Sequence, residues 1–159
     1  MFTDGGCSPD PGPGGYGVVL RCGSKRAEAC GGFRRTTNNR MEIYAVIRGL
    51  ELLKKSCDVT VYSDSQYLVK AMAKGWAAAW KRRGWWRTKT ERAANPDLWQ
   101  RLLDLCGGHQ VRFVWVRGHA GNRENERCDQ LTHAGRRQPN LPADEGFGRQ
   151  AESLVRRGG

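Results

Sequence analysis

Two hydrophobic periodicities alternate along the chain, and each predicts one kind of element. Short runs of β-branched and aromatic residues predict strands over residues 1–4, 16–22, 25–33, 59–64 and 111–116. Apolar residues at helical spacing predict helices over about 42–56, 65–73, 76–82, 96–106 and 122–137. Three strands joined by short loops, followed by helices and two further strands, predict an α/β fold with a mixed sheet and helices on both faces.

Two segments show neither periodicity. Residues 5–15 are crowded with glycine and proline, which predicts a loop after the first strand. Beyond Pro139 the chain contains proline, glycine and mixed charges, so we expect residues 143–159 to form a disordered tail. Residues 1–142 would then make one domain that is long enough to bury a core.

Positive charge is concentrated in one segment. The chain has 27 Lys and Arg against 16 Asp and Glu, a net charge of +11. Residues 81–92 contain six basic residues and one acid, Glu91, so this segment alone carries +5. A merely basic soluble protein remains the alternative, but this concentration favours a polyanionic partner, with nucleic acid the leading candidate.

Cysteine usage and hydropathy predict a cytoplasmic protein without a membrane partner. The six cysteines show no CxxC spacing, and most lie inside apolar patterns. We therefore expect reduced, mainly buried thiols rather than disulfides or a zinc site. No apolar run has the length of a membrane span, and no signal peptide precedes the first strand.

Four carboxylates are predicted to converge at one rim of the sheet. Asp4 ends the first strand and Asp64 ends the fourth, whereas Glu42 opens the long helix and Asp129 lies in the second turn of the last one. Like charges about 4 Å apart repel by roughly 4 kcal/mol at an effective dielectric of 20, which raises their pKa values. Alternatively, some of these acids pair with nearby arginines such as Arg40 and Arg127. For any single acid we favour that pairing, and for all four together we do not.

A pair of divalent cations would remove this repulsion. Oxygen ligands without cysteine or paired histidine suit Mg²⁺, with Mn²⁺ as the other candidate. Two such ions held side by side support phosphoryl displacement. Together with a polyanionic partner, the predicted site indicates a phosphodiesterase.

Several motifs, in order and with matching spacing, resemble type I ribonuclease H. The similarity runs from residue 1 to about 142. The motifs are 2–6 (FTDGG), 11–17 (PGPGGYG), 36–42 (TTNNRME), 63–67 (SDSQY), 80–85 (WKRRGW), 97–101 (DLWQR), 118–121 (GHAG) and 124–129 (ENERCD).

The resemblance implies a ribonuclease H-like five-stranded mixed sheet whose second strand is antiparallel. It also implies endonucleolytic cleavage of the RNA strand of RNA–DNA hybrids, with 5′-phosphate and 3′-hydroxyl ends, by a monomer. Asp4, Glu42, Asp64 and Asp129 match the family's metal-binding carboxylates. His119 matches its loop histidine, associated with proton transfer or product release; an ordinary solvated histidine is the alternative.

The resemblance also implies residues that bind the hybrid. Those matching the family's readers of the RNA 2′-hydroxyl are Cys7, Asn38, Asn39 and Gln66, and those matching its DNA-phosphate pocket are Arg35, Thr37 and Asn95. Those matching its DNA channel are Tyr67, Trp76 and Trp80, although the spacing of the two tryptophans alone favours core positions. Residues 81–95 match its basic protrusion, with Lys81, Arg82, Arg83 and Trp85 as contacts.

The chain departs from the family pattern in two places. The first strand starts at Met1 rather than several residues earlier, and Asp10 stands where an asparagine is typical, so a contact to RNA there would be weakened. Two other functions remain open: a hybrid-binding module without catalysis, and a nuclease of the same fold that acts on DNA. All four carboxylates are present, which argues against the first. The Thr-Asn-Asn stretch and the protrusion argue against the second.

Overall fold

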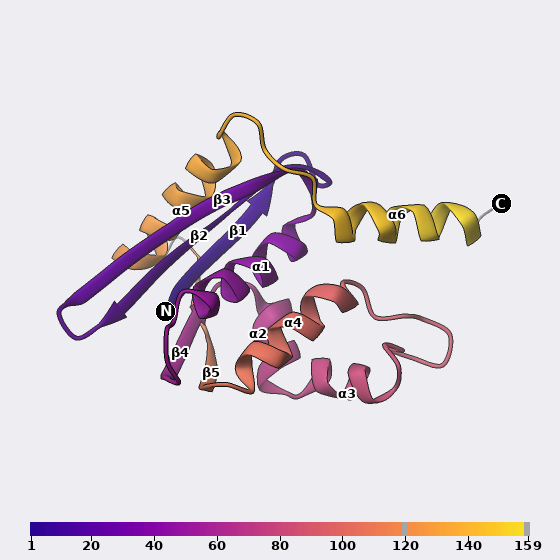
Figure 1. The fold of residues 1–159 in the computed structure, drawn as a ribbon, viewed down its shortest axis with the longest axis horizontal. Coiled ribbons are helices and arrows are strands. Elements are labelled where there is room, and N and C mark those ends of the chain that lie inside the picture. Colours follow the sequence, from indigo (N-terminus) through magenta and orange to yellow (C-terminus); the bar gives the residue numbers. More distant parts are fainter. Residues whose placement is uncertain (119–120, 158–159) are drawn as a thin grey trace.

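Five strands form one mixed sheet with β1 at its centre (Figure 1). The computed structural model describes residues 1–118 and 121–157. The sheet order is β3-β2-β1-β4-β5; β1 pairs antiparallel with β2 and parallel with β4, which confirms the predicted topology. The strands are β1 (Phe2–Cys7), β2 (Gly12–Cys22), β3 (Lys25–Thr36), β4 (Asp58–Ser63) and β5 (Gln110–Trp115).

Helices cover both faces of the sheet, as predicted (Figure 1). Val18 and Val19 are both fully buried but belong to different cores, because successive side chains on a strand point to opposite faces. Val19 packs with Cys128 of α5, whereas Val18 joins the main core under α1. The helices are α1 (Asn38–Glu51), α2 (Gln66–Ala73), α3 (Trp76–Arg82), α4 (Pro96–Cys106), α5 (Arg123–Arg136) and α6 (Glu145–Arg157).

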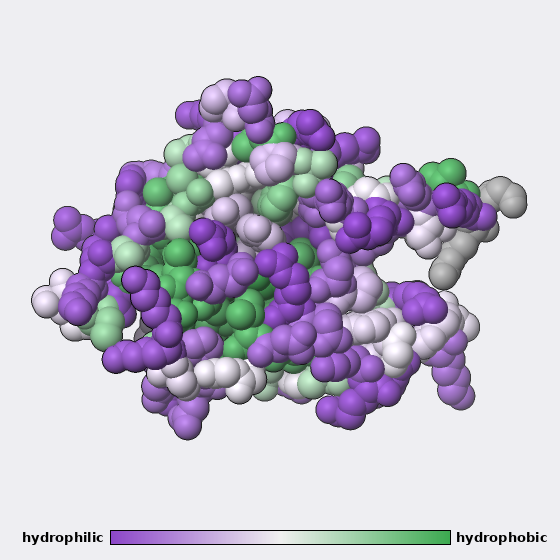
Figure 2. All heavy atoms as spheres, in the orientation of Figure 1, coloured by the Kyte–Doolittle hydropathy of each residue, from purple (hydrophilic) through white to green (hydrophobic). Residues whose placement is uncertain are grey.

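Hydrophilic residues cover most of the face drawn in Figure 2, and hydrophobic residues show through beside α1 and the sheet. No helix among the described residues is both long and apolar enough to cross a membrane.

The prediction of a loop over 5–15 is wrong, because all five glycines of this stretch lie in strands. Only residues 8–11 separate β1 from β2. Glycine is needed here for close packing: a Cβ on Gly5 would lie 2.4 Å from the Met41 carbonyl carbon of α1. On the other face, a Cβ on Gly17 would lie 2.5 Å from the Cys128 carbonyl oxygen of α5. The helix α1 therefore approaches β1, the strand that carries Asp4, and α5 approaches the neighbouring strand β2.

The prediction of a disordered tail is also wrong, because residues 145–157 form α6. Asp144, just before this helix, accepts hydrogen bonds from Thr36 Oγ1 at 2.7 Å and from the backbone N–H of Phe147 at 3.3 Å. It also accepts one from Arg40 Nε at 2.7 Å. The distal part of α6 projects away from the sheet (Figure 1).

Candidate active site

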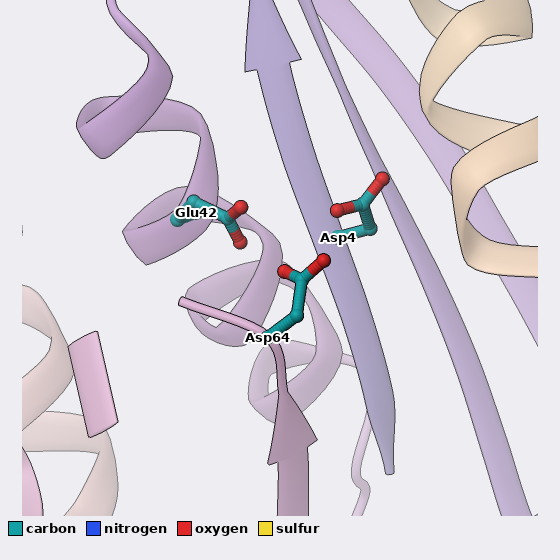
Figure 3. Close-up of side chains that lie close together, drawn as sticks. All are labelled: Asp4, Glu42 and Asp64. Carbon is teal, nitrogen blue, oxygen red and sulfur yellow. The ribbon is translucent and has the colours of Figure 1, made fainter. Parts of the chain in front are cut away.

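Three carboxylates from three elements meet at one rim of the sheet (Figure 3). Asp4 lies on β1, Asp64 follows β4, and Glu42 lies in the first turns of α1. Each offers an oxygen that lies within 4.8 Å of the others. Because β1 and β4 are parallel neighbours, they bring Asp4 and Asp64 to the same end of the sheet. Gly5 lets α1 come close enough to add Glu42.

The residue that caps α2 is the one after Asp64. Ser65, rather than Asp64, caps α2, and its hydroxyl oxygen accepts a hydrogen bond from the Leu68 backbone N–H at 3.2 Å. The Asp64 carboxylate points toward Asp4 and Glu42 (Figure 3).

Asp129, the fourth predicted carboxylate, lies beside the cluster rather than inside it. It lines a small pocket of about 30 Å³ together with Asp4 and Asp64. Its carboxylate is partly exposed and lies 3.6 Å from His133 Nε2. Asn125 and Glu126 line the same pocket. Their spacing of four and three residues from Asp129 places all three on one face of the helix, and this sequence signal could have identified them as site residues.

Burial and repulsion by neighbouring carboxylates favour the protonated forms of two of the clustered acids, Asp4 and Glu42. Burial first, and then the charge of Asp64, raise the pKa of Asp4 to about 7. Burial, and then the charge of Asp4, raise the pKa of Glu42 well above its ordinary value. Glu42 Oε2 is buried and has no hydrogen-bond partner among the described residues. A hard divalent cation would satisfy that oxygen, so the all-oxygen ligand set fits Mg²⁺ or a similar ion.

This protonation predicts a stabilising substitution. Folded Asp4 keeps a proton up to about pH 7, whereas the unfolded chain releases it near 3.8, so the free energy of unfolding falls as the pH rises between these values. With a chelator at pH 8, Asp4→Asn should therefore raise the melting temperature, and at pH 5 it should change it little. Thermal denaturation at both pH values measures this. Asp58→Asn, an exposed carboxylate paired with Arg112, is the control; equal shifts for Asp4→Asn at pH 5 and 8 would contradict the prediction.

His119 lies outside the described residues. Gly118, the last described residue before it, lies close to the cluster, because a Cβ on Gly118 would lie 2.8 Å from Asp64 Oδ2.

The predicted 2′-hydroxyl readers flank the carboxylates. The Asn38 carboxamide is held on both sides: its Oδ1 accepts from the Cys7 backbone N–H at 2.8 Å, and its Nδ2 donates to Asp10 Oδ2 at 2.9 Å. Asp10 thus orients Asn38, a role that the sequence did not indicate. Asn39 and Gln66 are exposed at the first turns of α1 and α2. Burial, and then the charge of Asp10, raise the pKa of Cys7 to about 12, so its thiol is neutral.

The predicted DNA-phosphate residues are only partly accessible. Arg35 is exposed. Thr37 caps α1, and its hydroxyl oxygen accepts from the Arg40 backbone N–H at 3.2 Å. Asn95 is 4% exposed and makes internal contacts: its Oδ1 accepts from Arg40 Nη1 at 3.3 Å, and its backbone N–H donates to Gln150 Oε1 at 2.9 Å.

The two tryptophans at helical spacing separate into a surface and a core position. Trp76 is 41% exposed, whereas Trp80 is 7% exposed and packs edge-on against Trp99 with ring centroids 6.0 Å apart. Tyr67 packs against the same ring from α2, at 5.5 Å. Trp80 therefore occupies a core position, the alternative that its spacing favoured, and it lies beneath the predicted DNA channel rather than on its surface.

The predicted basic protrusion is a folded loop. Its exposed cations include Lys81, Arg82 and Arg83 at the end of α3. Trp85, in a left-handed backbone conformation, packs partly against the core. The exposed Trp86 lies under the Arg92 guanidinium, whose carbon is 4.5 Å from the ring centroid. Such a cation–π contact holds the loop closed while its charges face solvent.

Comparisons with known proteins agree with this geometry. A family model described as RNase H matches residues 1–137. A ribonuclease H from Syntrophus aciditrophicus (strain SB) is 60% identical over 147 residues, which cover 92% of this chain and 85% of that relative.

Solved structures also match. LC9-RNase H1, described as a type 1 RNase H with the type 2 active-site motif, has a TM-score of 0.71 and 32% identity, covering 84% of this chain and 69% of that chain. LC11-RNase H1, solved in complex with an RNA/DNA hybrid, has a TM-score of 0.62 and 25% identity, covering 84% of this chain and 92% of that chain. The residues matched by the family model include the three clustered carboxylates and Asp129.

Proposed function

Because this chain belongs to the ribonuclease H family, we propose that it is an endonuclease that hydrolyses the RNA strand of RNA–DNA hybrids and leaves 5′-phosphate and 3′-hydroxyl ends. The observation that carries this proposal is the meeting of Asp4, Glu42 and Asp64 within 4.8 Å of one another. The solved complex of LC11-RNase H1 with a hybrid supports the choice of substrate. The protein would act as a monomer in the cytoplasm.

The three clustered carboxylates would hold two Mg²⁺ ions, with Mn²⁺ as a possible substitute and Asp129 as the ligand at the rim. When bound, such a pair of ions makes water a better nucleophile and neutralises charge on the scissile phosphate. The protein's contribution is a fixed and compact arrangement of oxygen ligands. Asp4 and Glu42 must give up their raised-pKa protons to the solvent before ions bind, so ion affinity would fall as the pH drops below about 7.

Residues around the cluster would select and place the hybrid. Asn38, oriented by Asp10, would exchange hydrogen bonds with a 2′-hydroxyl, which DNA lacks. Gln66, exposed two residues after Asp64, would do the same. Trp76 would pack against the DNA strand, and the cations of the protrusion would contact its phosphates. His119, which matches the family's loop histidine, would transfer a proton or assist product release.

The test is a cleavage assay on three labelled duplexes of one sequence, with and without Mg²⁺. We expect the RNA strand of the hybrid to be cut only with Mg²⁺, and duplex RNA and duplex DNA to stay intact. Comparable cutting of all three duplexes would instead indicate a less selective nuclease of the same fold. Tight hybrid binding without any cutting would indicate a binding module.

A further inference from the structure

A second, mixed-polarity groove lies between α6 and the segment that leads into α4. Its volume is about 460 Å³, and Arg92 and Arg149 place a cation on each of the two segments that form it. The apolar lining consists of Ala93, Ala94, Pro96 and Gly146, and Asp97, Gln150 and Ser153 complete the wall. Apart from Arg92, which belongs to the protrusion, these residues have no part in the proposed cleavage.

Three side-chain contacts, two of them partly buried, hold α6 in place, so the groove is a built feature of the fold. At the N-terminal end, Asp144 accepts hydrogen bonds from Arg40, a residue that is 1% exposed. One turn further along, the Arg35 guanidinium carbon lies 5.8 Å from the ring centroid of Phe147. Gln150 Oε1 then accepts the Asn95 backbone N–H at 2.9 Å. These three contacts, on successive turns, set the orientation of α6 against β3, α1 and the start of α4.

The charges of the groove favour an anion. Asp97, its acidic lining residue, is 2.7 Å from Arg40 Nη2. Burial alone would raise the pKa of Asp97, but its hydrogen bonds with Arg40 lower it, so its charge is compensated. Arg92 lies over Trp86, and among the described residues Arg149 has Glu145 as its one ion-pair partner, exposed and at 4.0 Å. Arg149 can therefore turn toward a ligand at small cost.

The polar donors and the apolar floor of the groove together suit one class of ligand. The hydrogen bond to Asn95 directs Gln150 Oε1 inward, so its Nε2 is left as a donor, and it makes no hydrogen bond within the described part of the chain. Two guanidinium groups and an amide suit phosphate oxygens. A floor of alanine, proline and glycine suits deoxyribose, which lacks the 2′-hydroxyl that a polar wall would bind.

We propose that this groove binds the sugar–phosphate backbone of the DNA strand of a hybrid and so extends the interface beyond the basic protrusion. The proposal rests on the proposed function for its ligand. Its support is continuity: Arg92 belongs to both the protrusion and the groove, and Asn95, matched to the DNA-phosphate pocket, is hydrogen-bonded to Gln150 of α6.

The test compares Arg149→Gln with the full-length wild type. Binding of a long, fluorescently labelled hybrid is measured by anisotropy in chelator across a range of salt concentrations. We expect about a three- to tenfold loss of affinity and a salt slope smaller by about one, because one phosphate contact releases about 0.9 counterion. A separate variant, Ser153→Glu, should weaken binding more than Arg149→Gln does, because the new carboxylate would repel the DNA phosphates.

The matched control is Arg112→Gln, an exposed arginine paired with Asp58 at the opposite end of β4 from the cluster; it should leave the affinity and salt slope unchanged. A short hybrid that fills only the carboxylate site should be cut by Arg149→Gln at the wild-type rate. If Arg149→Gln and Ser153→Glu both bind the long hybrid with wild-type affinity and salt slope, the proposal is overturned. Tighter binding by Gln150→Ala would also overturn it, because it would mean that α6 blocks the hybrid instead of binding it. If the wild type cuts no hybrid at all, the proposed function fails instead.

Discussion

Replacing Asp64 with asparagine is expected to abolish Mg²⁺-dependent cleavage of a hybrid while hybrid binding persists. Asp64 contributes one of three oxygens that lie within 4.8 Å of one another, and asparagine keeps its shape but loses the negative charge. Loss of an outer partner of a metal ligand already costs about 10- to 100-fold, so loss of a ligand should cost more than about 100-fold in rate. Single-turnover cleavage of an end-labelled hybrid measures the rate, and anisotropy in chelator measures binding.

Asp58→Asn is the matched control, because it removes an exposed carboxylate from the start of the strand that Asp64 follows. It should cleave and bind like the wild type. Cleavage by Asp64→Asn within about tenfold of the wild-type rate would remove the argument for a metal site at this cluster. Loss of binding together with cleavage would show that Asp64 supports the fold or the interface instead. Calorimetric titration with Mg²⁺ adds a readout that does not depend on turnover.

The convergence of three carboxylates could be predicted because Asp64 directly follows a strand, Glu42 lies near the start of a helix, and Asp4 lies in a strand that was expected to neighbour that of Asp64. The strand β1 continues past Asp4 to Cys7, so Asp4 lies within its strand rather than at its end, but the parallel pairing of β1 with β4 still brings it beside Asp64. The helix starts were equally readable, because Thr37, Ser65 and Asn122 accept capping hydrogen bonds from N–H groups three residues later. These caps depend only on residues three positions apart, which is why the sequence indicates them.

The predictions that were wrong all concern residues whose conformation or burial depends on contacts between distant segments. Glycine was taken as a loop signal, although Gly5 is needed because α1 crosses β1 so closely. Trp80 and Asn95 carry the family's motif spacing, but packing against Trp99 and Gln150 buries both. The helix at the C-terminus depends on a pairing with Arg40 across 104 residues, which no local pattern indicates.

Replacing Arg40 with methionine is expected to destabilise the protein more than any other single change proposed above. Arg40 is 1% exposed and joins three helices: from α1 it contacts Asp97 of α4 and Asp144 before α6, both at 2.7 Å. Burial alone would lower the pKa of Arg40, but its hydrogen bonds with both acids raise it, so it stays charged. Methionine would leave two partly buried carboxylates unpaired, which costs about 3–5 kcal/mol of unfolding free energy. Urea and thermal denaturation measure this; the melting temperature should fall by about 6–20 °C.

The control and the pH dependence separate this effect from a simple loss of packing. Arg101→Met removes an exposed arginine that joins α1 and α4 through Glu51 at 3.3 Å, and it should cost less than about 1 kcal/mol. Asp97 has a lowered pKa in the folded protein, so the stability that it contributes is present above 3.8 and is lost as the pH falls through its folded value. The difference between wild type and Arg40→Met should therefore shrink in strong acid, and adding Asp144→Asn should recover part of the loss because it removes one unpaired charge. A difference that stays constant with pH would attribute the effect to packing alone.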